Sequence, residues 1–214
     1  MTCYDSRMQL QDVVGLTLVS GLITFLVGAG AWRLRYEQPM PEVLWVIHDD
    51  RRRRAWVHLW MAPAVFITTA GVGGYAATAV AGSAAAVSAV MSSIVYAMGA
   101  VCWVVALAFR LTVVVWAAEH AVEHGQPPHG FVALDRWAGS LHVVHMTSAY
   151  AAFVLLGSAT VMAGDLPSWV GWLGVGWGLS FLAGFVATRF AGPFNPPFWA
   201  HAYTGVVGVA LLVS

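Results

Sequence analysis

The chain has 214 residues, of which 59% are hydrophobic and only 9% are charged. A soluble domain carries about 25% charged residues, so this composition argues against a soluble protein. The formal net charge is zero, and the missing basic surface excludes nucleic acid as an expected partner. We expect a single transmembrane helical domain over residues 1–214, with membrane lipid as its surroundings.

Six apolar runs follow one another along the chain. The first, residues 13–32, has no basic segment before it and exceeds the roughly 7–15 residues of a signal-peptide core, so it is expected to be a retained helix. None of the runs alternates with a period of two, which favours helices over strands. The predicted fold class is therefore all-α, a polytopic membrane protein with a bundle of six transmembrane helices. The other five runs cover residues 56–80, 90–118, 139–163, 168–188 and 198–213.

The arginines predict the orientation of the bundle. The chain has no lysine, and nine of its ten arginines fall on one side if the loops after the first, third and fifth helices share that side. Arg7 is the exception. The positive-inside rule makes those loops cytoplasmic and both termini extracytoplasmic. Gly174 and Gly178 in the fifth helix form a GxxxG motif, which indicates close helix packing.

All eight histidines map to the predicted cytoplasmic half. The densest group lies in Glu119-His120-Ala121-Val122-Glu123-His124. If the third helix continues past Ala118, Glu119 and Glu123 share one face and His120 and His124 share the next. We expect Glu119 or Glu123 to be a further metal ligand or a general base.

A second histidine pair opens the fourth helix. His142 and His145 are spaced i, i+3, and a helical hairpin would bring them near the first pair. Imidazole and carboxylate groups suit transition metals such as iron or zinc. His58 and His201 open helices at the same end and are additional candidate ligands. The predicted metal ligands are His120, His124, His142 and His145.

Arg110 lies within the third apolar run, roughly 13 Å before Glu119 at the helical rise per residue. A guanidinium at a helix centre costs about 2.5 kcal/mol or more, so it should be paired, reach the interface or bind a ligand. No acidic residue lies in another predicted helix, so no ion-pair partner is expected. We expect Arg110 to hold an anionic headgroup of the substrate.

The stretch Leu166-Pro167-Ser168-Trp169-Val170-Gly171-Trp172-Leu173-Gly174 resembles one found in uncharacterised multi-pass membrane proteins of high-GC bacteria. The lysine-free, Ala/Val/Gly-rich usage is similar too. The resemblance implies the inner (plasma) membrane of a bacterium and no particular reaction.

Three functions remain open at this stage. The leading hypothesis is a membrane-embedded enzyme with a metal-binding His/Glu cluster at the cytoplasmic face and a hydrophobic, lipid-like substrate. The first alternative is a haem b or quinone-linked electron-transfer subunit, in which His58 or His201 pairs with His142 or His145. The second is a non-enzymatic transporter or an accessory subunit. A homo-oligomer or a larger membrane complex is compatible with each.

Overall fold

The computed structural model describes the backbone of residues 3–33 and 39–214 and the side chains of residues 8–33 and 39–214. The regular structure of this part of the chain is helical, with short connecting turns and no strand. The elements are α1 (Cys3–Ala29), α2 (Glu42–Asp49), α3 (Arg51–Thr78), α4 (Ala84–Leu111), α5 (Val113–His124), α6 (Phe131–Ala163), α7 (Ser168–Ala187), the 3-10 helix η2 (Gly192–Phe194) and α8 (Trp199–Val213).

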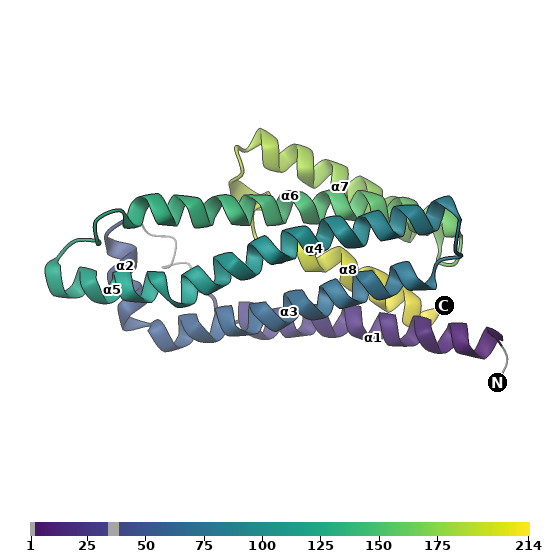
Figure 1. Cartoon of the computed structure of the whole chain (residues 1–214), viewed down its shortest axis with the longest axis horizontal. Coiled ribbons are helices and arrows are strands. Elements are labelled where there is room, and N and C mark those ends of the chain that lie inside the picture. The colour runs from purple at the N-terminus through teal and green to yellow at the C-terminus, as the bar shows by residue number, and fades with distance from the viewer. Residues whose placement is uncertain (1–2, 34–38) are drawn as a thin grey trace.

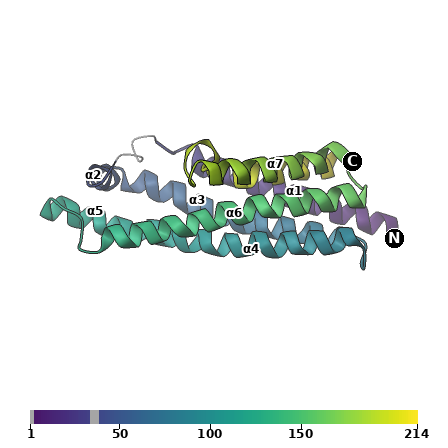
Figure 2. The same cartoon turned by 90° about the horizontal axis from the view of Figure 1, so that it is seen from above.

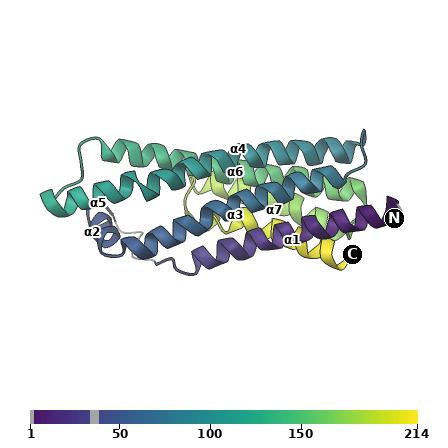
Figure 3. The ribbon, with the colours of Figure 1, turned by 60° about the horizontal axis from the view of Figure 1, so that its bottom comes forward.

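The long helices run side by side along one axis (Figure 1). Long helices that follow one another in the chain pack together: α1 on α3, α3 on α4, α4 on α6 and α6 on α7. The last helix, α8, returns to pack on α1. Figure 2 shows α7 on the opposite side of α6 from α4, and Figure 3 shows α1 and α8 together at the end that holds both termini. The short helices α2 and α5 lie at the other end.

Within the described residues, five helices are long and apolar enough to cross a membrane. Their outward faces carry large apolar side chains, for example Phe66, Met98 and Val101, each at least 60% exposed. Such continuous apolar surface is typical of helices surrounded by lipid. α8 is apolar but has only 15 residues and is not one of these five helices, so the sixth membrane-spanning helix stays a prediction. The chain is thus an all-helical protein, consistent with a membrane protein.

The end opposite the termini is a helical lobe rather than a set of loops. The condition that the third helix continues past Ala118 is met, because α5 follows α4 after one irregular residue, Thr112, and runs to His124 before the left-handed Gly125. Here α2 packs on α5. We call the end formed by α2, α5, the last turn of α4 and the first turns of α3 and α6 the distal lobe. Its core contains Val43, Leu44, Ile47, Phe109, Val114, Ala117, Ala118, Ala121, Phe131 and Ala138.

Four helices begin earlier than predicted. α1 begins at Cys3 instead of residue 13, α3 at Arg51 instead of 56, α4 at Ala84 instead of 90 and α6 at Phe131 instead of 139. Hydropathy marks the apolar part of a helix, whereas α1, α3 and α6 extend beyond it into polar sequence. Gly130, with φ of 79°, provides the left-handed turn before α6, and buried Phe131 then stacks on Phe109.

Glycines let α6 and α7 approach closely, as the GxxxG motif indicated. A Cβ atom on Gly178 would lie 2.5 Å from the carbonyl oxygen of Tyr150, and one on Gly157 would lie 2.5 Å from that of Gly171. Because both contacts are with backbone atoms, no side-chain rotation could make room for the added methyl group. The close packing keeps the end of α7 and the following turn against α6.

Candidate functional site

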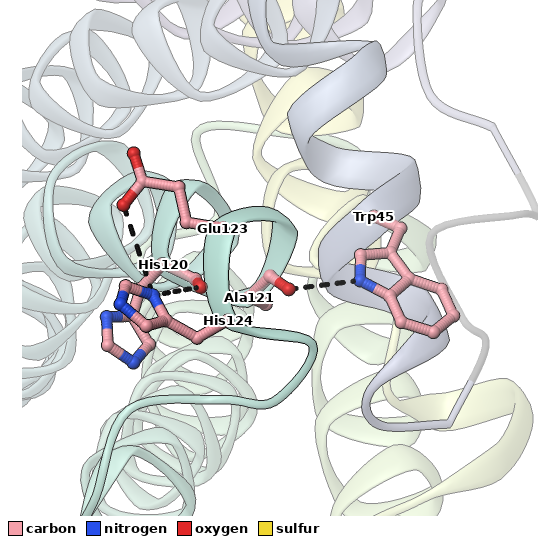
Figure 4. A network of polar contacts seen from close by, with 5 residues as sticks. All are labelled: Trp45, His120, Ala121, Glu123 and His124. Carbon is pink, nitrogen blue, oxygen red and sulfur yellow. Dashed lines mark hydrogen bonds and ion pairs between the residues drawn. The ribbon is translucent and has the colours of Figure 1, made fainter.

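The first predicted histidine pair lies on the distal lobe. The rings of His120 and His124 stack with centroids 4.1 Å apart on α5, away from Trp45 of α2 (Figure 4). His124 Nδ1 is 3.1 Å from the carbonyl oxygen of His120 and 3.9 Å from the Glu123 carboxylate. On the other side of α5, Trp45 Nε1 donates to the Ala121 carbonyl at 3.4 Å. The pair therefore interacts mainly with its own helix.

No three His, Cys, Asp or Glu side chains within residues 8–33 and 39–214 are placed to hold a metal ion. A metal bound by protein side chains generally needs at least three of them. The structure therefore does not gather His120, His124, His142 and His145 into one such group. Glu119 and Glu123 are exposed on α5. The metal-site prediction gains no support from this arrangement.

The second predicted pair, His142 and His145, faces the bundle interior. α4 and α6 come close at Gly99, where a Cβ atom would lie 2.7 Å from that of Ser148. One turn further along α4, Trp103 contacts both imidazoles, with centroid distances of 4.8 Å to His142 and 5.3 Å to His145. The second contact is a near-parallel stack at 11°. His145 is fully buried and His142 is partly buried.

The turn between α7 and α8 holds His142. Arg189 and Phe190 both have positive φ, at 54° and 65°, and the Phe190 N–H donates to the Phe185 carbonyl at 2.7 Å. Left-handed backbone costs such residues roughly 1–2 kcal/mol each, so the surrounding contacts must enforce it. The turn brings Asn195 to His142, whose Nε2 lies 3.0 Å from the side-chain oxygen and 3.1 Å from the carbonyl oxygen.

His201 opens α8 and is also fully buried. Its ring stacks on Phe25 of α1 with centroids 4.6 Å apart. Its Nδ1 is hydrogen-bonded to Thr68 Oγ1 of α3 at 2.9 Å, and Thr68 is itself fully buried. Three helices thus fix the orientation of this imidazole.

His58 lies on α3, one turn after Arg54. Its Nδ1 is 2.7 Å from the Arg54 carbonyl oxygen, and its ring meets the edge of Trp32 at 6.4 Å. Only 5% of His58 is exposed. His58 is therefore enclosed, but one of its nitrogens is already held by its own helix.

Several nitrogen atoms in the interior have no hydrogen-bond partner in the part of the chain that the structure describes. They are His142 Nδ1, His145 Nδ1, His145 Nε2, His201 Nε2, Trp103 Nε1 and Trp177 Nε1. The ring of His145 also lies close to the backbone of Gly99 on α4. We call His142, His145 and His201 the interior histidines. A buried polar atom without a partner destabilises the fold by about 1–3 kcal/mol. A ligand that bonds to one of these nitrogens would recover that free energy on binding.

Arg110 has an acidic partner, so the expectation of none is wrong. Its Nη1 donates to Asp135 Oδ1 at 2.7 Å, and each side chain is about 30% exposed. Asp135 was assigned to a loop because the start of α6 was placed after it. The binding of an anionic headgroup by Arg110 stays a prediction.

Sequence reasoning missed the residues that orient the interior histidines. Thr68, Trp103 and Asn195 come from three different segments and share no motif. The available signal was weak: a threonine and a tryptophan inside apolar runs, and an asparagine between prolines. Comparison with family models, curated proteins and solved structures finds no match to this chain.

Proposed function

We propose that this chain is an electron-transfer membrane subunit that binds haem b or a quinone among the interior histidines. One observation carries the proposal. His145 on α6 and His201 on α8 are fully buried, and each keeps a ring nitrogen without a hydrogen-bond partner in the described chain. Histidine enclosed in this way in a membrane-spanning bundle is costly and is typically functional.

Either redox group suits these nitrogens. Haem requires only one or two axial ligands from the protein, because the porphyrin supplies the other four. A quinone has two carbonyl oxygens that accept hydrogen bonds from imidazole or indole N–H groups. Both groups carry electrons between partners, and the chain's residues would bind the group, orient it and exclude water. A metal held by protein side chains alone is less well supported, because the described residues offer no three-ligand group.

The proposal includes a location and partners. The arginine-rich distal lobe would face the cytoplasm of a bacterium, with the chain in the inner membrane and both termini outside. Arg51–Arg53 are exposed on the lobe, as expected of residues next to anionic lipid. The electron donor and acceptor would be other subunits of a larger membrane complex or a bilayer quinone.

The test is cofactor analysis of the full chain purified in mild detergent without a polyhistidine tag. We expect either a haem absorption band or about one quinone per chain in an organic extract. His145→Ala should remove the cofactor, whereas His124→Ala, on the exposed face of α5, should retain it. A folded protein with neither group would refute the proposal. Stoichiometric non-haem iron or zinc would instead favour the metal-enzyme hypothesis.

A further inference from the structure

We propose that His120 and His124 of α5 chelate a divalent transition-metal ion at the surface of the distal lobe, with water completing the coordination of the ion. This site is separate from the proposed function, because it lies on one surface helix and not among the interior histidines. It also differs from the four-histidine site predicted from the sequence, since it requires no ligand from α6.

α5 lies beyond the apolar layer that the long helices can cross. The stretch Ala84–His124, which joins α4 and α5, has 41 residues and extends about 60 Å, twice the thickness of a bilayer core. The ion pair of Arg110 with Asp135 marks where α4 and α6 become polar. His120 lies about 15 Å further along, at the end of the bundle opposite the termini (Figure 1). The histidine pair is therefore accessible to ions in water.

The hydrogen bond of His124 selects the nitrogen that can bind the ion. His124 Nδ1 lies 3.1 Å from the His120 carbonyl oxygen, which can only accept, so Nδ1 carries the proton of the neutral ring. The lone pair is then on Nε2. Metal-binding histidines commonly donate their second ring N–H to a backbone carbonyl in this way, which fixes the orientation of the ligand.

The second imidazole is one helical turn away. Residues spaced i, i+4 share a helix face, and the ring centroids of His120 and His124 are 4.1 Å apart (Figure 4). The His120 ring forms no hydrogen bond with the described residues, so it can turn to direct a nitrogen at the same ion as His124 Nε2. A small rotation of this kind gives both nitrogens the roughly 2.0–2.1 Å distance of a zinc–imidazole bond.

The surroundings of the pair attract a cation. The Glu123 carboxylate lies 3.9 Å from His124 Nδ1, Glu119 is a second exposed carboxylate, and α5 contains no arginine or lysine. α5 ends at His124, so the partial negative charge of the helix C-terminus lies beside the ligands. Imidazole ligands select zinc, copper or nickel, because calcium and magnesium prefer oxygen.

The experiment titrates Zn²⁺ into the full chain, purified in mild detergent without a polyhistidine tag and stripped with EDTA, by isothermal titration calorimetry. We expect one ion per chain. His120→Ala and His124→Ala should each weaken binding about a hundredfold, because the chelate loses one of two linked ligands. Matched controls are His129→Ala, in the exposed turn after α5, and His48→Ala, beside Asp49 on α2. Both should keep the affinity of the original protein.

A second measurement identifies the ligands independently of affinity. With Cu²⁺ in place of Zn²⁺, electron paramagnetic resonance should show coupling to two imidazole nitrogens in the original protein and to one in His120→Ala or His124→Ala. Hydrogen exchange of residues 119–124 should slow on addition of Zn²⁺ only when both histidines are present, because the chelate joins consecutive turns of α5.

Unchanged binding in His120→Ala or His124→Ala would show that the assigned pair is wrong. The inference also fails if the folded, metal-free chain binds neither Zn²⁺ nor Cu²⁺, or if His129→Ala weakens binding as much as His124→Ala does. None of these results bears on the proposed function, which is judged from the haem and quinone content of the interior.

Discussion

At the scale of single residues, Thr68 has the most specific predicted role. If the haem b of the proposed function were held by His201 Nε2, Nδ1–H would donate to Thr68 Oγ1, 2.9 Å away, which would make the imidazole a stronger electron donor and favour ferric iron. Thr68→Val removes the acceptor with little change in shape. We expect haem content to be kept and the reduction potential to rise by about 60 mV, a tenfold change for a one-electron couple.

Potentiometric titration checks this expectation, and Thr68→Ser is the matched control. Serine keeps the hydroxyl and should restore a potential close to that of the original protein. A merely structural role for Thr68 predicts loss of haem in the valine variant, or an unchanged potential in both variants, and either result contradicts the positioning role.

The ion pair between Arg110 and Asp135 should contribute to the stability of the distal lobe. Asp135→Asn weakens a charge-assisted contact of 2.7 Å while keeping the size of the side chain. Because about 30% of each side chain is exposed, solvent screening limits the expected loss to about 1 kcal/mol. Thermal unfolding followed by intrinsic fluorescence should show a small decrease in Tm. Asp12→Asn, at an exposed position on α1, is the control and should leave the Tm unchanged.

The histidines show how far the sequence could define the site. The i, i+4 rule correctly predicted that His120 and His124 are neighbours. It could not predict which face of α5 meets α2, because that depends on contacts such as the one between Trp45 and Ala121, which come from different helices. Likewise the burial of His201 depends on Phe25 and Thr68, which lie in two other helices. Spacing defines neighbours on one helix, and tertiary packing selects the site.

At the scale of elements, two glycines of α7 allow the close contact between α6 and α7 to be tested. Gly178→Ala places a methyl group 2.5 Å from a backbone carbonyl, and such overpacking costs about 1–3 kcal/mol. For a chain of this size we expect the Tm to fall by roughly 5 °C. Gly176→Ala is the matched control, since its Cβ atom meets nothing within 4 Å. Alanine there should be neutral or slightly stabilising because it favours the helix.

These two variants also test whether the turn after α7 depends on this packing. If Gly178→Ala separates α7 from α6, the turn that brings Asn195 to His142 should loosen as well. Hydrogen exchange of residues 188–197 should then increase in Gly178→Ala and remain unchanged in Gly176→Ala. Equal Tm values for the two variants would contradict the close approach of the helices.

Element boundaries were harder to predict than the elements themselves. The apolar runs predicted the long helices, because continuous hydrophobic sequence of this length has few other stable conformations in lipid. The charged residues Asp135 and Arg136 lie outside the apolar run but inside α6, since a helix continues past the membrane when its neighbours support it. α2 was missed within a charged segment because its apolar residues, such as Leu44 and Ile47, are few and pack on another helix.

At the scale of the whole molecule, the arginines predict which end of the bundle faces the cytoplasm. The arrangement of the helices limits the possible orientations in a membrane to two. The N-terminal end of α1 and the C-terminal end of α8 lie at one end of the bundle, and the distal lobe lies at the other (Figure 1). The two ends must then be on opposite sides if the long helices cross a bilayer. The positive-inside rule assigns the distal lobe to the cytoplasm, since Arg51–Arg54, Arg110 and Arg136 lie towards that end.

Single cysteines test this assignment in intact cells. In a Cys3→Ser/Cys102→Ala background, Ser214→Cys at the end of α8 should react with a membrane-impermeant maleimide added outside. His129→Cys, which replaces an exposed residue of the α5–α6 turn, should react only after the membrane is permeabilised. The reverse pattern would invert the orientation and move the interior histidines near the outer face. Labelling of both sites from outside would contradict membrane insertion of the bundle, because its two ends could not then lie on opposite sides of a bilayer.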